Sequence, residues 1–99
     1  MGVGKAALEA IARGLARDLG PLGHRVNCLS SGPLETKAAS SIPGSSKISD
    51  AWKIAPIDWN MAESRESVAG GAIYLLSDLS RAVTGTILCV DGGFSAMAI

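Results

Sequence analysis

The chain has 99 residues, of which 47% are hydrophobic and 18% charged, and nine basic residues balance nine acidic ones for a formal net charge of +0. A chain of this size buries roughly 60 to 65% of its unfolded surface, which is enough for one globular unit with a modest core. Nucleic-acid binding needs a clustered surplus of Lys and Arg, so the balanced charge argues against a nucleic-acid partner. No run approaches the ~20 apolar residues of a membrane helix, and MGVGKAALEA does not resemble a signal peptide, so we expect a cytoplasmic protein without a membrane partner.

Two cysteines bear on metal binding and on the redox compartment. Cys28 and Cys89 lie far apart in apolar stretches, and neither has a His or a second Cys beside it. A structural metal site needs several such ligands at short spacing. We therefore predict no metal site and two buried free thiols, as is usual in a reducing compartment.

The first predicted element is an amphipathic helix over residues 6–19. Apolar residues recur there at spacings of three and four, which places them on one side of a helix. Gly20 and Pro21 end the pattern, because glycine readily adopts the left-handed conformation and proline cannot extend a helix. The apolar positions are Leu8, Ile11, Ala12, Leu15, Ala16 and Leu19.

A short strand and a long irregular segment follow. Residues 24–30 have the apolar and β-branched content of a strand, which ends at Ser31, Gly32 and Pro33. Residues 34–63 mix Ser, Gly, Pro and Lys with isolated apolar anchors, so we predict an excursion with short helical turns. The anchors are Ile42, Ile48, Trp52, Ile54 and Trp59.

A second helix is predicted over residues 64–77. Ser64 is a favourable N-cap, and apolar residues recur after it with helical period. Gly70 and Gly71 each weaken a helix by ~1 kcal/mol relative to Ala, and paired glycines often permit close packing on a sheet. The helix is therefore expected to lie against strands.

The last predicted strand covers residues 86–90. Its continuous apolar run is typical of a buried parallel strand. Asp91, Gly92 and Gly93 read as a tight turn after it, and the apolar tail over residues 94–99 should pack on the rest of the chain.

The element order is helix, strand, excursion, helix, strand. Two strands joined through a helix form a right-handed parallel crossover. A two-stranded parallel sheet has exposed edges, and parallel sheets are stable when helices cover both faces. We therefore predict an α/β protein, with residues 1–99 forming the C-terminal part of a larger Rossmann-like, doubly wound parallel sheet.

Two glycine motifs near the start are poor matches to nucleotide-binding loops. Residues 2–7 read GVGKAA, which fits either GxGxxA or the end of a phosphate loop. Both motifs need a strand before the glycines, and the phosphate loop also needs Ser or Thr at Ala6. We interpret Gly2 and Gly4 as residues that ease the start of the helix or its packing.

Several segments together resemble the enoyl-acyl-carrier-protein reductases, which are short-chain dehydrogenases. SSGPLETKAAS is similar to their SAGPxxTxAAS, and MGVGKAALE to their MGxAKAxLE, whereas RVN and VDGG are common to many short-chain dehydrogenases. Met1 stands four residues before Lys5, where enoyl reductases have Met and other short-chain dehydrogenases have the catalytic Tyr. By the same resemblance, the enoyl reductase Tyr would fall before residue 1, so it is absent from this chain.

The resemblance implies a binding site for NADH. Lys5 matches the catalytic Lys that hydrogen-bonds the nicotinamide ribose, and it is expected to lie near the turn at 32–36. The loop of Leu34, Glu35, Thr36, Lys37 and Ala38 matches the segment that covers the cofactor, where a backbone amide and carbonyl read the carboxamide and the Thr36 hydroxyl reaches the pyrophosphate. Residues 39–60 would cover the substrate, with an acyl slot drawn from Ile42, Ile48, Trp52 and Ile54.

The predicted function is NADH-dependent reduction of a trans-2-enoyl thioester carried on acyl-carrier protein, in fatty-acid synthesis. Because the first βαβ unit and the Tyr are missing, we expect the 99-residue chain alone to be inactive. Family members are homo-oligomers that associate through the first helix and the last strand, so one alternative is a non-catalytic oligomerisation or interaction remnant. A second alternative is part of a 3-ketoacyl-type short-chain reductase.

Overall fold

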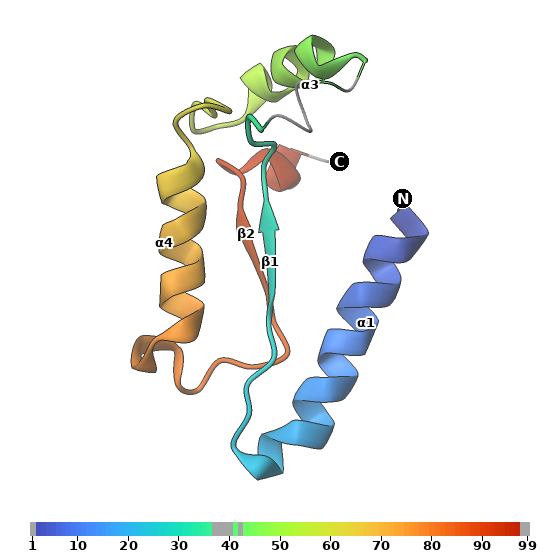
Figure 1. The fold of residues 1–99 in the computed structure, drawn as a ribbon, viewed down its shortest axis with the longest axis vertical. Coiled ribbons are helices and arrows are strands. Elements are labelled where there is room, and N and C mark those ends of the chain that lie inside the picture. Colours follow the sequence, from blue (N-terminus) through green and yellow to red (C-terminus); the bar gives the residue numbers. More distant parts are fainter. Residues whose placement is uncertain (1, 37–40, 42, 98–99) are drawn as a thin grey trace. The chain divides into compact units, whose positions relative to one another are not determined.

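A computed structural model of the chain describes residues 2–36, 41 and 43–97. Figure 1 shows helices and strands in the predicted alternation. The chain divides into two compact units, Met1–Leu29 with Gly71–Leu88 and Ser30–Gly70 with Cys89–Ile99. The elements are α1 (Gly2–Leu19), η1 (Gly20–Leu22), β1 (Cys28–Ser31), α3 (Ser45–Ala51), η2 (Trp52–Ile54), α4 (Arg65–Leu76), η3 (Asp78–Ser80), β2 (Ile87–Val90) and η4 (Phe94–Met97).

The two strands pair in a parallel sheet, as predicted. β1 and β2 are neighbours and run in the same direction in Figure 1. The Cys28 N–H donates to the Thr86 carbonyl at 2.9 Å, and the Gly32 N–H donates to the Val90 carbonyl at 3.0 Å. Because α4 lies in the connection between the strands, the α/β crossover is confirmed.

Helix α1 begins at Gly2, earlier than predicted, and ends at Leu19 as predicted. Gly20, Pro21 and Leu22 then form a 3-10 turn, which Gly23 closes with a left-handed φ of 88°. The apolar side of the helix is buried only at Ala12 and Ala16, each 7% exposed. The larger side chains of this side remain accessible, because Leu8 and Ile11 are each 57% exposed and Leu15 is 43% exposed.

Strand β1 begins at Cys28, not at residue 24. The preceding residues are held mainly by side-chain hydrogen bonds, with one backbone bond from the Gly85 N–H to the Val26 carbonyl at 2.8 Å. The Asn27 amide donates to the Val83 carbonyl at 3.0 Å and accepts from the Thr86 N–H at 3.1 Å. The Arg25 guanidinium donates to the Leu75 carbonyl at 2.8 Å, so it satisfies a carbonyl at the end of α4 that has no partner within the helix.

Helix α4 falls within one residue of its predicted limits at each end. A Cβ placed on Gly70 would meet nothing within 4 Å, so the close packing expected of the glycine pair is not found at this position. Ile73 and Leu76 are 67% and 85% exposed. No helix among residues 2–36, 41 and 43–97 is both long and apolar enough to cross a membrane.

Both cysteines are free thiols, but the prediction that they are buried is wrong. Cys28 is half-buried and Cys89 is exposed. Along β2, exposed and half-buried residues alternate, which is the pattern of a strand covered on one face only. A fully buried strand would need cover on both faces.

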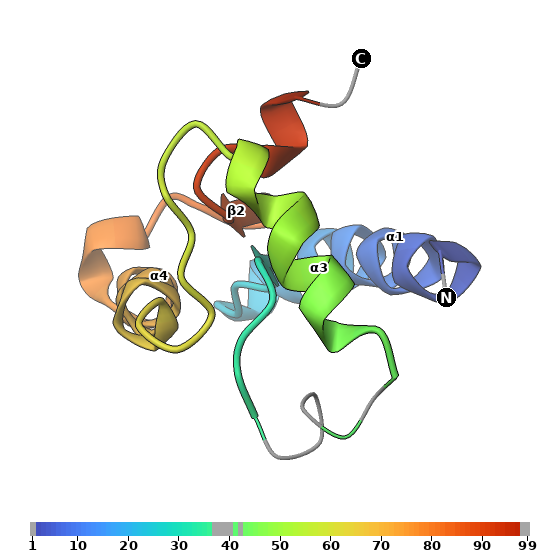
Figure 2. The ribbon, with the colours of Figure 1, turned by 90° about the horizontal axis from the view of Figure 1, so that it is seen from above.

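The excursion contains the short helices that were predicted, α3 and η2. Figure 2 shows this region beside η4, and an aromatic stack joins them. The rings of Trp52 and Phe94 lie 3.9 Å apart between centroids with an interplanar angle of 17°. The start of the apolar tail therefore packs on the excursion, as predicted.

Candidate functional site

The candidate site is the loop over residues 32–36, which directly follows β1. Gly32 is buried, and its N–H continues the sheet by donating to Val90. A Cβ at position 32 would lie 2.5 Å from Cε2 of Trp59, closer than real Cβ contacts. Glycine is therefore required at the point where the chain leaves the sheet.

Residues 59–65 hold this loop through three hydrogen bonds. The Trp59 indole N–H donates to the Pro33 carbonyl at 2.7 Å. The Glu35 N–H donates to the Met61 carbonyl at 3.0 Å, and the Arg65 guanidinium donates to the Glu35 carbonyl. The Pro33 carbonyl and both backbone groups of Glu35 are thus already paired within the protein.

Leu34 lies between these two anchored residues. It is half-buried, and among the described residues its backbone N–H and carbonyl have no hydrogen-bond partner. Backbone polar groups that are shielded from water without partners are costly. Leu34 therefore has one backbone donor and one backbone acceptor without a protein partner among the described residues.

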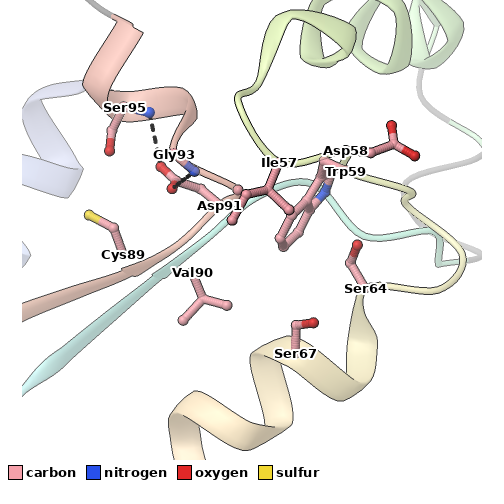
Figure 3. Close-up of a pocket in the computed structure, with 11 residues that line it drawn as sticks. Ile57, Asp58, Trp59, Ser64, Ser67, Cys89, Val90, Asp91, Gly93 and Ser95 are labelled. Carbon is pink, nitrogen blue, oxygen red and sulfur yellow. Dashed lines mark hydrogen bonds between the residues drawn. The ribbon is translucent and has the colours of Figure 1, made fainter.

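The turn after β2 is a second organised feature. Gly92 and Gly93 have left-handed φ values of 65° and 87°, which confirms the predicted tight turn. Asp91 is buried, and its carboxylate accepts from the Gly93 N–H at 3.0 Å and the Ser95 N–H at 3.1 Å, as Figure 3 shows. Burial acts to raise the pKa of Asp91, but hydrogen bonds from Ser95 and Gly93 outweigh it, so the pKa lies below its ordinary value.

This turn holds the end of the excursion. The Ile57 N–H donates to the Gly92 carbonyl at 2.9 Å. A Cβ on Gly92 would lie 2.5 Å from the Ile57 carbonyl oxygen, and one on Gly93 would lie 3.2 Å from Cγ of Pro56. The turn therefore fixes the segment from which Trp59 extends toward the loop.

A cavity of about 480 Å³ lies between this turn and the start of α4. Figure 3 shows Trp59, Val90 and Asp91 on one side and the hydroxyls of Ser64 and Ser67 on the other. Among the described residues, those predicted to bind the cofactor do not line it. Within the described part of the chain, no group of three His, Cys, Asp or Glu side chains is placed to hold a metal ion.

The predicted cofactor residues fall in different parts of the chain. Lys5 is exposed on α1 and belongs to the first unit, so its approach to the loop stays a prediction. Leu34, Glu35 and Thr36 lie in the second unit. The remaining predicted residues, Lys37 and Ala38, lie outside the described residues.

The predicted acyl-slot residues that the structure describes differ in their surroundings. Ile48 and Ile54 are 44% and 61% exposed, and Trp52 stacks on Phe94. Ile42 lies outside the described residues. The assignment of a substrate slot to this segment stays a prediction.

Two side chains that organise the loop were not singled out for that role from the sequence. The sequence predicts Trp59 only as an apolar anchor, and no sequence pattern points to Arg65. The Trp59 bond joins residues 26 positions apart, so no local pattern indicates it. The one sequence feature related to this contact is a glycine at position 32 and a large aromatic residue at position 59. Only the folded structure shows that the ring of Trp59 occupies the space beside Gly32.

Comparison with known proteins decides the family. A family model described as enoyl-(acyl carrier protein) reductase matches residues 1–95. The chain belongs to this family. It is 46% identical to enoyl-acyl-carrier-protein reductase (NADH) 1 of Rhizobium meliloti over 99 residues, covering 100% of this chain and 36% of that protein. It is 42% identical over 100 residues to the corresponding enzyme of Escherichia coli strain K12, covering 100% of this chain and 37% of that protein.

Solved structures of family members share the fold. The reductase of Bacillus cereus, solved with NADP+ and indole naphthyridinone, has a TM-score of 0.88 and 39% identity, over 100% of this chain and 38% of that one. The reductase of Anaplasma phagocytophilum, solved with NAD, has a TM-score of 0.87 and 42% identity, over 100% of this chain and 37% of that one. The family and the Rossmann-like α/β class predicted from the motifs are thereby confirmed. The chain spans little more than a third of the length of these relatives.

Proposed function

We propose that this chain is the C-terminal portion of an NADH-dependent enoyl-acyl-carrier-protein reductase of fatty-acid synthesis. Residues 1–99 would form part of a single Rossmann-like domain whose first βαβ units lie elsewhere in the protein. When bound, NADH would supply the hydride for the β-carbon of a trans-2-enoyl thioester, and a proton added at the α-carbon would complete the saturated thioester. Family membership and the geometry of the loop at 32–36 support the proposal.

The backbone of Leu34 carries this proposal. A nicotinamide carboxamide has one carbonyl acceptor and one NH2 donor, which complement one backbone N–H and one backbone carbonyl. Pro33 has no N–H and its carbonyl is paired, and both backbone groups of Glu35 are paired. Leu34 is therefore the residue of this loop suited to read the carboxamide.

The remaining cofactor contacts follow from the family motifs. Lys5 would donate to the ribose hydroxyls and add positive potential beside the catalytic Tyr of the complete enzyme. The Thr36 hydroxyl would reach the pyrophosphate, and Lys37 and Ala38 would contribute backbone contacts. The backbone contact predicted for Glu35 is not retained, because its N–H and carbonyl are already paired with Met61 and Arg65. Both Lys5 and Thr36 are exposed, as groups that meet a ligand must be.

We also propose that the complete enzyme is homo-oligomeric and cytoplasmic. Val3, Leu8 and Ile11 are 86%, 57% and 57% exposed along α1, an apolar surface suited to association with protein. The same exposure favours the second candidate, a non-catalytic remnant that binds other subunits. The two candidates differ in one respect, because only the reductase requires Leu34 to meet a nicotinamide.

The test is a titration of the 15N-labelled 99-residue chain, with reduced nicotinamide mononucleotide as ligand and ribose 5-phosphate as control. The proposal predicts that the nicotinamide ligand shifts the Leu34 amide resonance and that ribose 5-phosphate, which lacks the carboxamide, does not. If both ligands leave Leu34 unchanged while the chain is folded, the interaction remnant is the better description.

A further inference from the structure

We infer that Trp59 and Arg65 are positioning residues, which act on the cofactor through the backbone on either side of Leu34. The inference rests on the proposed function, since it explains how the same loop is prepared for a nicotinamide. Both residues lie in the segment 59–65 and reach back to the loop at 32–36. Neither residue lies in the sequence motifs that resemble those of the enoyl reductases.

Trp59 sets the direction of the Leu34 N–H. A peptide unit is planar, and in its trans form the carbonyl and the following N–H point in opposite directions. The indole N–H of Trp59 holds the Pro33 carbonyl at 2.7 Å, so the Leu34 N–H is turned away from Trp59. The indole ring also occupies the space where a side chain at position 32 would lie, which keeps the chain from shifting toward it.

The next peptide unit is fixed in the same way. The Glu35 N–H donates to the Met61 carbonyl at 3.0 Å, so the Leu34 carbonyl points away from Met61. Arg65, the first residue of α4, donates from its guanidinium to the Glu35 carbonyl. The donor and the acceptor of Leu34 are therefore both aimed by neighbours and need little reorganisation when a ligand binds.

Trp59 is itself held in place by the rest of this unit. The backbone bond from Ile57 to Gly92 anchors the chain two residues earlier. The Trp52 ring lies 6.0 Å from the Trp59 ring between centroids, with an interplanar angle of 47°. Trp52 thus belongs to the same aromatic cluster, yet its indole N–H has no hydrogen-bond partner among the described residues.

This difference gives a matched pair of variants. Trp59→Phe keeps an aromatic ring and removes the donor to Pro33, whereas Trp52→Phe keeps a ring and removes an N–H without a protein partner. Loss of one buried hydrogen bond changes an equilibrium by about tenfold. We expect amide hydrogen exchange at Glu35 in the 99-residue chain to accelerate about tenfold in Trp59→Phe and to stay unchanged in Trp52→Phe.

A second pair tests Arg65 without disturbing the aromatic cluster. Arg65 is exposed, so substitution should leave the chain folded. Arg65→Gln is expected to accelerate exchange at Thr36, whose N–H shares a peptide unit with the Glu35 carbonyl. Arg65→Lys keeps a cationic donor and is expected to recover part of the protection.

Reduced nicotinamide mononucleotide separates this inference from the proposed function. Faster exchange at Glu35 in Trp59→Phe, together with weaker ligand binding than in Trp52→Phe, supports both. Faster exchange in a chain that binds no nicotinamide supports the positioning of the loop and counts against the reductase. Equal exchange in Trp59→Phe and Trp52→Phe overturns the inference, whatever the ligand does.

Discussion

The two ends of β1 are both held by side chains that bind backbone, but they are held for different purposes. At the entrance, Arg25 and Asn27 use their own side chains to satisfy carbonyls and an N–H of residues 75–86. At the exit, Trp59, Met61 and Arg65 come from a distant segment and pair with the Pro33 carbonyl and with the backbone N–H and carbonyl of Glu35. The entrance bonds fix β1 to the segment that follows α4, whereas at the exit the backbone N–H and carbonyl of Leu34 have no partner among the described residues.

Gly92→Ala is expected to lower the free energy of unfolding the most, because it disrupts the turn after β2 that holds the segment leading to Trp59. A left-handed alanine costs about 1 to 2 kcal/mol, and the clash of its Cβ with the Ile57 carbonyl adds about 1 to 3 kcal/mol. The free energy of unfolding in urea should fall by about 3 kcal/mol. Gly70→Ala is the matched control, since its Cβ meets nothing within 4 Å and should stabilise the helix by about 0.5 to 1 kcal/mol. Equal losses in the two variants would contradict the role given to the turn.

Arg25→Met should have the second largest effect on the free energy of unfolding, because it removes the hydrogen bonds that hold the chain just before β1. The guanidinium donates to Ser80 and to the carbonyls of Leu75, Ser77 and Val83. Removing a charged donor from several partners should lower the free energy of unfolding by about 2 kcal/mol. Arg17→Met is the control, since among the described residues Arg17 pairs only with Asp18, at side-chain exposures of 79% and 62%. A loss no greater than that of the control would show that the Arg25 bonds contribute little.

These comparisons also show which parts of the structure could be predicted. Helices α1 and α4 and strand β2 were found because their apolar periodicity is local. The start of β1 was misplaced because Arg25 and Asn27 replace the strand ladder with side-chain bonds to distant residues. Burial of Cys89 was wrongly predicted because a sequence does not reveal whether both faces of a strand are covered.

The site was only partly predictable for the same reason. The loop at 32–36 was identified through its resemblance to a family motif, and its position after a strand agrees with where such sheets bind ligands. The choice of Leu34 required the partners of Pro33 and Glu35, which join residues separated by 26 to 30 positions. Such contacts depend on the fold and have no local signal.

The smallest predicted effect is the contribution of Asp91, in the turn after β2, to the pH dependence of the free energy of unfolding. The folded pKa of Asp91 lies below its ordinary value, so the unfolded chain binds a proton more readily. The stability that Asp91 contributes is therefore present above its ordinary pKa and is lost as the pH falls through the folded pKa. Urea unfolding of Asp91→Asn between neutral and acidic pH should show less acid destabilisation than the unsubstituted chain. Parallel curves would contradict the role given to this carboxylate.

The most direct test of the account is a set of nuclear Overhauser measurements on the 15N-labelled chain with reduced nicotinamide mononucleotide. The account predicts contacts between the carboxamide protons of the ligand and the Leu34 N–H. It predicts none with Ser64 or Ser67, which line the separate cavity beside the Asp91 turn. Carboxamide contacts at that cavity, with Leu34 silent, would contradict the claim that the loop after β1 reads the nicotinamide.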